Sequence, residues 1–276
     1  MAITRVEFNY IRDLVRERSA LELEPGKEYL VESRLGLLAS KEGFPSLRRM
    51  VESLRSSPSS DLHRKVVEAM ATTETSFFRE IRTFEMFKKT ILPELLALRA
   101  SDRSLNLWCA ASSAGQEPYS FAMLLREHLP SLGSWSIKFI ASDISQEMLA
   151  RARAGRFNQV EINRGLPANL LVKYFEKHGA AWVISQNIRC MVEFREINLI
   201  HSWPLLPIMD VIFMRNILIY VDLGTKRSIL RKARHLLKPD GYLLLGGSET
   251  TTNLDDSFEP VSVDGATYFR LKKKEA

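Results

Sequence analysis

The sequence predicts an α/β protein in which a doubly wound, mainly parallel sheet follows an all-helical region. Two patterns predict this class. From Thr4 to about Met70 apolar residues recur at helical spacing, and the alternation typical of strands is absent. From Leu105 onward short apolar runs alternate with amphipathic helical patterns, which favours parallel strands covered by helices on both faces. A chain of 276 residues with 45% apolar and 26% charged residues has an ordinary globular composition, with room for one large domain or two smaller ones.

Four helices are expected in the first region. In the first helix, Val6, Tyr10 and Leu14, together with Ile11 and Val15, follow the spacing of one buried face. Turns rich in Pro, Gly and Ser separate three further helices, at residues 28–39, 47–54 and 62–70. We therefore predict a helical domain over residues 1–70, followed by a linker and connecting helix over residues 71–104.

Residues 105–276 form the second predicted domain. Parallel strands are expected at residues 105–110, 137–141, 211–214 and 241–245, with helices between them at 121–129, 146–153 and 229–237. A last strand, 267–271, follows the turn signal Asp264–Gly265 and is expected to pair antiparallel at an edge. An insert at about 165–194 interrupts this rhythm. There, residues 182–185 and 189–194 are strand-like and fit a small antiparallel hairpin around Gln186–Asn187.

Several classes of protein are excluded. No apolar run reaches the roughly 18–20 residues of a membrane span, and residues 1–7 lack the apolar core of a secretory signal. The two cysteines, Cys109 and Cys190, are too few and too far apart for a disulfide scaffold or a zinc site. Both lie in apolar runs, so we expect buried, reduced thiols and a cytoplasmic protein. The five histidines lack metal-ligand spacing, so no metal site is expected. A net charge of +6 permits an acidic partner without identifying one.

Two strand ends carry the residues that indicate a ligand. The first strand runs into Ala110–Ser120, where small residues around Gly115 let a ligand approach the backbone. With a single glycine, this turn lacks the phosphate-binding pattern of dinucleotide sites. The second strand ends at Asp143, which could accept hydrogen bonds from ribose hydroxyls or could cap the next helix, as Ser145 also could. Together they favour an adenosine ligand without a pyrophosphate, for which S-adenosylmethionine is the natural candidate. Glu117 could then meet the ammonium group of that ligand.

Five segments, occurring in one order along the chain, resemble the CheR family of chemoreceptor glutamate methyltransferases. The resemblance covers essentially the whole chain. Its specific part is the combination of Phe77-Phe78-Arg79-Glu80 with Arg215-Asn216-Ile217-Leu218-Ile219-Tyr220, whereas Leu237–Gly241 has counterparts in many methyltransferases. The five segments are residues 73–80, 115–120, 141–144, 214–220 and 237–243.

The resemblance implies a fold and an activity. The fold is a class I S-adenosylmethionine-dependent methyltransferase, with a Rossmann-like doubly wound sheet, an all-α N-terminal domain and a small antiparallel, three-stranded β insert. The implied reaction moves a methyl group from S-adenosyl-L-methionine to glutamate side chains on a receptor's cytoplasmic helices. It yields γ-methyl esters for chemotactic adaptation and leaves S-adenosyl-L-homocysteine. The implied partners are methyl-accepting chemotaxis receptors, with no nucleic acid and no direct membrane insertion.

The resemblance also implies site residues. It places Arg79 and Tyr220 beside the transferred methyl group as catalytic residues. Glu117 and Asp143 would bind the methionine amine and the ribose, and the other cofactor contacts would flank the adenine or close the methionine end of the pocket. The full set implied for the cofactor is Thr73, Thr75, Arg79, Glu117, Asp143, Asn198, Leu199, Arg215 and Asn216.

The chemistry agrees with this assignment. A carboxylate is already ionised at pH 7 and a sulfonium is a good leaving group, so no strong general base is needed. What remains is in-line alignment of the reacting atoms and removal of water from the carboxylate. Arg79 could orient the carboxylate through two hydrogen bonds, and Tyr220 could donate one. Each residue also has a structural alternative, because Arg79 could simply pair with Glu80 and Tyr220 could be a core aromatic.

The sequence departs from the family pattern at three places. Thr73 stands where many relatives carry asparagine, and Gln116 replaces a frequent glutamate. The insert is short at His178–Ala181, whereas relatives that dock a receptor's C-terminal peptide have a longer, glycine-rich loop there. We therefore predict that this enzyme is independent of such a tether. In the helical domain the candidate receptor contacts are Arg34, Lys41, Arg48 and Arg49.

The sequence leaves two alternative functions. The pI near 9.3 permits a nucleic-acid methyltransferase, but the chain has no Pro-Pro dipeptide, which enzymes acting on base amines usually carry, and no Pro-Cys nucleophile. The second alternative is a signalling module that senses S-adenosylmethionine without catalysis. The presence of Arg79, Glu117, Asp143 and Tyr220 argues against such a module.

Overall fold

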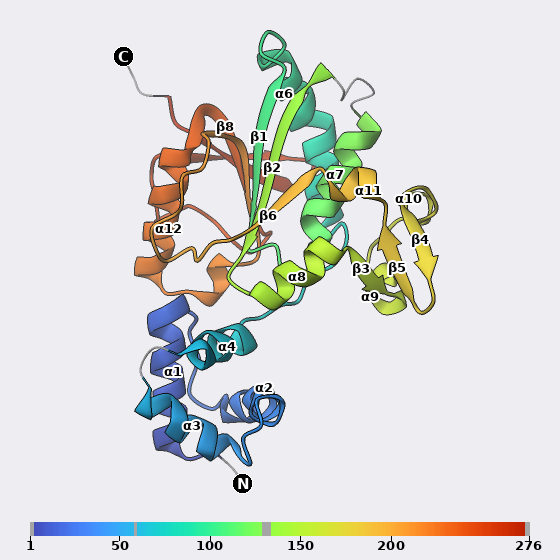
Figure 1. Cartoon of the computed structure of the whole chain (residues 1–276). Coiled ribbons are helices and arrows are strands. Elements are labelled where there is room, and N and C mark those ends of the chain that lie inside the picture. The colour runs from blue at the N-terminus through green and yellow to red at the C-terminus, as the bar shows by residue number, and fades with distance from the viewer. Residues whose placement is uncertain (1–2, 58–59, 129–133, 274–276) are drawn as a thin grey trace. The chain divides into compact units, whose positions relative to one another are not determined.

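The computed structural model describes residues 3–57, 60–128 and 134–273 (Figure 1). The chain divides into two compact units. One consists of Met1–Thr72 with Tyr220–Thr225, and the other of Thr73–Ile219 with Lys226–Ala276. Within the described ranges, no helix has the length and apolar run that crossing a bilayer requires.

The smaller unit contains the four expected helices, α1 (Arg5–Ser19), α2 (Glu28–Lys41), α3 (Leu47–Ser56) and α4 (Asp61–Met70). Thr4 begins α1 through a capping box with Glu7, whose carboxylate accepts from the Thr4 backbone N–H (2.8 Å). The predicted buried face of α1 is wrong at Val6, which is 65% exposed because the buried stripe begins at Phe8. The core of this unit is formed by Phe8, Ile11, Leu14, Val15, Leu23, Val31, Leu35, Ala39, Met50, Val51, Leu54, Val66 and Met70.

Three of the basic side chains expected to meet a receptor have partners inside the smaller unit. The Arg34 guanidinium donates to the carbonyl oxygens of Met70 and Ala71 (2.7 and 3.0 Å), which satisfies the C-terminal end of α4. Arg48 and Arg49 both pair with Glu52 at the exposed surface. A receptor contact through these residues stays a prediction, and Arg34 has a clear structural role as well.

The larger unit is built on a seven-stranded sheet in the order β6-β2-β1-β7-β8-β10-β9 (Figure 1). The first five strands in this order are parallel, and β10 runs antiparallel to both β8 and β9. The final strand is therefore not at an edge as expected, because the strand β9 that precedes the Asp264–Gly265 turn covers it. The strands are β1 (Ser104–Ala110), β2 (Ser136–Asp143), β6 (Val192–Glu196), β7 (Met209–Met214), β8 (Leu237–Leu245), β9 (Phe258–Val263) and β10 (Ala266–Leu271).

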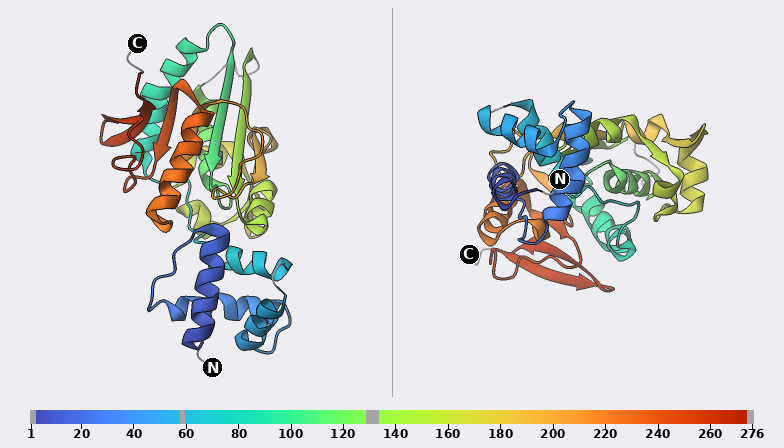
Figure 2. Two further views of the ribbon diagram at one scale, coloured as in Figure 1. Left: turned by 90° about the vertical axis from the view of Figure 1, so that its left-hand side faces the viewer. Right: turned by 90° about the horizontal axis from the view of Figure 1, so that it is seen from below.

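Helices cover both faces of this sheet, as two further views show (Figure 2). The connecting segment forms α5 (Ile81–Met86), a π-helical turn (Phe87–Ile91) and α6 (Leu92–Leu98). The crossover helices are α7 (Gln116–His128), α8 (Gln146–Ala154) and α12 (Leu223–Leu236). Leu129, which was expected to continue α7, lies outside the described residues.

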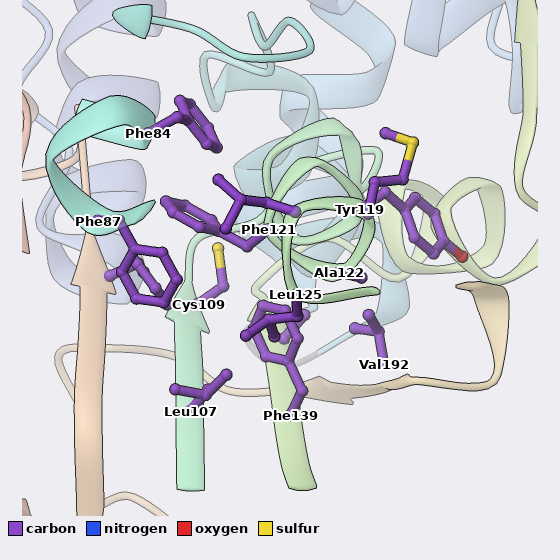
Figure 3. Packing of buried hydrophobic residues seen from close by; sticks show 14 of the residues in the cluster. Phe84, Phe87, Leu107, Cys109, Tyr119, Phe121, Ala122, Leu125, Phe139 and Val192 are labelled. Atoms are coloured by element: carbon purple, nitrogen blue, oxygen red, sulfur yellow. The ribbon is translucent and has the colours of Figure 1, made fainter. Parts of the chain in front are cut away.

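An aromatic core joins α5 and α7 to the sheet (Figure 3). Phe121 of α7 stacks on Phe213 of β7 (ring centroids 3.9 Å apart) and on Phe84 of α5 (4.3 Å). All three rings are buried. Aromatic side chains bury large areas and pack in preferred geometries. This stack therefore fixes how α5 and α7 pack against β7.

A separate three-stranded sheet has the order β3-β5-β4, with β3 (Arg156–Asn158), β4 (Phe175–His178) and β5 (Ala181–Ile184). The predicted hairpin between residues 182–185 and 189–194 is wrong. Gln186–Arg189 form the short helix α11, and Val192–Glu196 become β6, which pairs parallel with β2. Val192 and Phe194 are buried and Glu193 is exposed, so the alternation expected of a hairpin instead suits the edge of the large sheet. Two further helices flank the small sheet, α9 (Gln159–Asn163) and α10 (Ala168–Tyr174).

The two cysteines differ. Cys109 is buried in β1 as expected, whereas Cys190 is exposed, which corrects the prediction. Cys190 follows the last residue of α11, so the apolar run around it crosses a helix end at the surface. Both thiols are free.

A buried cluster of charged side chains links the amino-terminal ends of β1, β7 and β8 to the segment after α6. Asp210, fully buried in β7, accepts from Arg99 Nε (2.7 Å) and from the Asn106 backbone N–H (2.8 Å), and Lys238 Nζ lies 2.9 Å away. The Arg99 guanidinium also pairs with Asp240. Hydrogen bonds to Asp240 and Asp210 raise the pKa of Arg99, so its charge is permanent. Asp210 therefore neutralises cations that have little access to water.

Replacing Asp210→Ala should lower the free energy of unfolding by about 3 kcal/mol, because a buried cation and a strand N–H lose their acceptor. Urea denaturation at pH 7 measures this change. Asp102→Ala, at an exposed position, is the matched control and should stay within about 0.5 kcal/mol of the parent. A loss for Asp210→Ala no larger than that of the control would contradict the role of the cluster.

Candidate functional site

The carboxyl ends of β1, β2, β7 and β8 lie side by side, and this edge carries most of the predicted site residues. In an open parallel sheet this is where a ligand crevice forms. The turn after β1 needs three left-handed residues, Ala111 (φ 56°), Ser113 (φ 48°) and Gly115 (φ 92°). A Cβ on Gly115 would come within 3.0 Å of Ala152 Cβ, so glycine allows α7 and α8 to approach closely here.

Asp143, at the end of β2, joins two of these strand ends. Its Oδ2 accepts from the Ser113 backbone N–H (2.7 Å) and its Oδ1 from the Ser145 N–H (2.9 Å). The expected helix cap is provided by Ser145, whose hydroxyl accepts from Met148 N (3.2 Å). Asp143 thus fixes the turn after β1, and its binding of the ribose hydroxyls stays a prediction.

A buried cation lies at the end of β7. The Arg215 side chain has no exposed surface and pairs with Glu117 of α7 and with Glu80, whose Oε2 is 3.1 Å from Arg215 Nη2. Nη2 also donates to the Arg79 carbonyl oxygen (2.6 Å). Burial lowers the pKa of Arg215, but the charges of Glu117 and Glu80 outweigh it and the net shift is upward. One guanidinium therefore links the linker segment, α7 and β7.

The surroundings set the protonation of two neighbours of this cation. Burial raises the pKa of the Cys109 thiol well above its usual value, and the charge of Glu117 raises it further. The thiol stays protonated and donates to Glu117 Oε1 (3.2 Å). Burial also raises the pKa of Glu80, but the Asn216 hydrogen bond and the Arg215 charge together lower it below its ordinary value. Glu80 is therefore ionised at neutral pH.

Asn216 and Glu249 complete this edge of the sheet. Asn216 adopts a left-handed conformation (φ 58°), and its Nδ2 donates to Glu80 Oε1 (3.1 Å). Glu249 accepts backbone N–H groups from Asn216 (2.7 Å), Leu218 (2.6 Å) and Gly246 (2.7 Å). The sequence reasoning missed Glu249, because a carboxylate that binds backbone N–H groups of a distant loop leaves no local pattern. Glu80 lies within the first of the five segments, and the sequence suggested it only as an alternative partner of Arg79.

The remaining predicted residues are placed as follows. Thr73 is exposed, and its carbonyl accepts from the Ser113 hydroxyl (2.8 Å). Thr75 and Arg79 are half-buried, and Arg79 Nη1 donates to the Glu74 carbonyl (3.3 Å). After β6, the Asn198 side chain accepts from Ile200 N (3.2 Å) and the buried Leu199 offers its carbonyl to Trp203 Nε1 (3.1 Å). Tyr220 belongs to the smaller unit, where its carbonyl accepts from Glu22 N (3.0 Å).

The edge formed by these strand ends has buried polar groups of the kind that a polar ligand would bind. Within the described residues, Ser112 Oγ, Gln116 Oε1 and Arg215 Nε are buried side-chain atoms without a hydrogen-bond partner. Such atoms are rare in folded proteins unless a ligand or water completes them. Two lie at the turn after β1 and the third at the end of β7. The set offers both donors and acceptors, and with Asp143 and Glu117 it suits an amino-acid nucleoside that carries a positive charge.

The sequence matches two family models. The model "CheR methyltransferase, all-alpha domain" covers residues 6–71, and "CheR methyltransferase, SAM binding domain" covers residues 73–267. Chemotaxis protein methyltransferase 1 of Pseudomonas aeruginosa is 37% identical over 276 residues, which are 99% of this chain and 100% of that protein. Chemotaxis protein methyltransferase 1 of Vibrio cholerae is 37% identical over 278 residues, with 98% and 99% covered.

A solved structure of the glycopeptide N-methyltransferase MtfA with S-adenosylmethionine is also similar, at a TM-score of 0.34 and 16% identity over 64% of this chain and 62% of that one. That likeness is too distant to support a functional statement.

A doubly wound sheet together with an S-adenosylmethionine-binding domain defines a class I methyltransferase. The chain belongs to the CheR methyltransferase family, because both family models and full-length relatives match it. The family, the enzyme class and the cofactor expected from the sequence are thereby confirmed.

Glu117→Gln should weaken the binding of S-adenosylhomocysteine about 10–100-fold if Glu117 meets the ligand's ammonium group as predicted, because the variant keeps the side chain's shape and loses its charge. Isothermal titration calorimetry measures this affinity. Glu127→Gln, on the same helix but bonded to Tyr174 and Lys173, is the control and should bind like the parent. Equal affinity of the parent and both variants would show that Glu117 does not contact the ligand.

Proposed function

We propose that this chain methylates glutamate side-chain carboxylates on the cytoplasmic helices of chemoreceptors, forming γ-methyl esters for chemotactic adaptation. It would act in the cytoplasm, on methyl-accepting chemotaxis receptors. The observation that carries the proposal is that the all-alpha and the S-adenosylmethionine-binding family models match consecutive parts of one chain. Relatives named chemotaxis protein methyltransferases match over nearly their full length.

We also propose that the parts of the chain have different roles. Residues 1–70 would recognise the receptor, residues 71–104 would link and contact the cofactor, and residues 105–276 would bind the cofactor. The small β3-β5-β4 sheet lies between residues 156 and 184, which corrects the expected insert at about 165–194. Cofactor contacts would come from Thr73, Thr75, Arg79, Glu117, Asp143, Asn198, Leu199, Arg215 and Asn216. The polar groups that the crevice gathers at the ends of β1, β2 and β7 support this assignment.

S-adenosylmethionine, when bound, supplies a methyl group activated by a positively charged sulfur. Asp143 would accept from its ribose hydroxyls, while Glu117, held by Arg215 and by the Cys109 thiol, would face its ammonium group. The carboxylate of Glu117 has acceptor capacity beyond these two bonds. Because Arg215 and Glu117 are almost completely shielded from water, their orientation is fixed before the ligand arrives.

Arg79 and Tyr220 would act on the incoming glutamate. That carboxylate arrives ionised, so the protein's task is to align it and strip its water rather than to remove a proton. The Arg79 guanidinium could hold both carboxylate oxygens, and the Tyr220 hydroxyl could donate one hydrogen bond. A cation and one hydrogen bond orient the nucleophile while leaving charge on the attacking oxygen.

The two alternatives predict different products. A nucleic-acid methyltransferase would leave N-methyl or C-methyl groups, which survive mild base, and a sensing module would leave no product. Glutamyl methyl esters, by contrast, hydrolyse in mild base and release methanol. The basic residues of the sequence also show no aromatic interleaving suited to base stacking.

Incubation with methyl-labelled S-adenosylmethionine and a purified receptor should transfer label to the receptor, and mild base should release that label as volatile methanol. Arg79→Ala should lower the rate at least about 100-fold, because the carboxylate loses its orienting cation. A receptor whose glutamates are replaced by alanine at the modified positions is the control. Label that resists base would contradict the proposed ester chemistry.

We further propose that methylation needs no tethering peptide. The strands β4 and β5 pair from His178 with Ala181, so only Gly179 and Ala180 form the turn, and Gly179 is left-handed (φ 64°). Such a two-residue hairpin has no loop to close over a docked peptide.

A peptide copying a receptor's C-terminus should therefore show no binding by calorimetry at concentrations up to about 100 μM, equivalent to less than about 6 kcal/mol of binding free energy. Receptors with and without that C-terminus should be methylated at equal rates. Micromolar affinity for the peptide would show this proposal to be wrong.

A further inference from the structure

The segment that carries Arg79 is a strained turn. Phe78 (φ 48°) and Glu80 (φ 59°) are both left-handed, and neither is glycine. Such residues persist only where the surrounding structure holds them, and they cluster at functional sites. The two strained residues flank Arg79. The contacts that hold this turn therefore also determine the position and direction of the Arg79 Cα–Cβ bond.

Side chains rather than packing hold one end of this turn. The Glu80 carboxylate accepts from Asn216 Nδ2 (3.1 Å) and from the Gly247 N–H (3.0 Å), and it pairs with Arg215 (3.1 Å). Arg215 also binds the Arg79 carbonyl oxygen (2.6 Å). At the other end, the Phe78 N–H donates to the Ser120 hydroxyl (3.0 Å).

The partners of Glu80 are themselves fixed. The Glu249 carboxylate accepts from the backbone N–H of Asn216 and from that of Gly246, which precedes Gly247. It therefore holds both loops that contact Glu80. A Cβ on Gly246 would lie 2.5 Å from Asn216 Nδ2, so the two loops are in close contact. Glu80 is therefore anchored to the ends of β7 and β8 and not to a mobile surface.

Apolar packing holds the Phe78 end of the turn, where the Phe78 ring lies against Phe84 (ring centroids 5.0 Å apart). At the Glu80 end, a cavity of about 610 Å³, lined by Glu80, Ile81 and Gly247 among others, lies beside the start of α5. Within the described residues, the Arg79 guanidinium has one hydrogen bond, to the Glu74 carbonyl (3.3 Å). The side chain is thus aimed by its backbone.

We propose that Glu80 is a positioning residue: by anchoring the Phe78–Glu80 turn on Arg215, Asn216 and Gly247, it aims the Arg79 guanidinium at the carboxylate that is methylated. This inference rests on the proposed function, in which Arg79 orients that carboxylate. Glu80 contacts neither substrate nor cofactor in this role and acts through Arg79.

A double-mutant cycle tests the coupling. Glu80→Asn removes the anchor but keeps the left-handed conformation accessible, since asparagine tolerates it better than most residues. In the parent background, kcat for receptor methylation at saturating cofactor should fall about 30–100-fold, as expected for a misplaced orienting group. In an Arg79→Ala background the same change should cost less than about threefold, because the group it positions is gone. Glu80→Gln, which keeps the length and one acceptor oxygen, should recover part of the loss.

Hydrogen exchange tests the anchor without receptor or cofactor. The peptide covering residues 77–84 should exchange about tenfold faster in Glu80→Asn than in the parent, while the midpoint of urea unfolding changes little, since only a local opening is affected. The control is Glu161→Gln, which removes a carboxylate that caps α9 and pairs with Arg151 in the small-sheet region. It should leave both exchange at residues 77–84 and kcat unchanged.

The outcomes separate this inference from the proposed function. Equal losses of kcat in both backgrounds would overturn it, because Glu80 would then act through Arg215 or through stability. Unchanged exchange at residues 77–84 would overturn it as well. A parent protein that labels no receptor would instead remove the proposed function, and the exchange measurement would still decide whether Glu80 anchors the turn.

Discussion

The site depends on one buried cation. Arg215 has no exposed side-chain surface, and a guanidinium in that position is tolerated only when carboxylates and carbonyls surround it. Its partners come from three parts of the chain far apart in sequence, namely Glu80, Glu117 and the Arg79 carbonyl. Losing both carboxylates would leave the Arg215 charge buried without compensation, whereas losing Glu80 alone leaves the pair with Glu117. The same requirement that makes the cluster costly to disturb also gives the crevice a single arrangement.

The aromatic core explains how those parts reach one another. Phe84, Phe121 and Phe213 stack between α5, α7 and β7, and the polar partners Glu80, Glu117 and Arg215 lie four, four and two residues from them. Arg215 also lies over the Phe84 ring (5.5 Å to the centroid). Apolar burial thus brings the three backbones together, and the ion pairs then fix their side chains. The division is physical, because burial is non-directional whereas ion pairs and hydrogen bonds select one geometry.

The sequence predicts much of the secondary structure and several residues of the candidate site. Hydrophobic periodicity indicated the four helices and the alternating strands, because burial of one face repeats locally along the chain. Asp143 was predicted from its place at the end of a strand, and the structure puts it at the last position of β2. The β6 assignment failed because Val192 and Phe194 alternate equally well in a hairpin or at a sheet edge, and local pattern does not name the partner strand. Cys190 was misjudged because an apolar run can cross a helix end at the surface.

The sequence by itself determined the family, the order of elements and the residue types at the strand ends, since these follow from local pattern and motif. Only the tertiary structure decided that Glu80 and Asn216 meet, that Glu249 binds the backbone of two loops, and that the Arg79 turn is strained. The Glu80–Asn216 bond joins two side chains 136 positions apart, and the Glu249 carboxylate accepts from the Asn216 backbone N–H 33 positions away. Such bonds depend on where the fold places each N–H group, and a backbone N–H has no signature in the sequence.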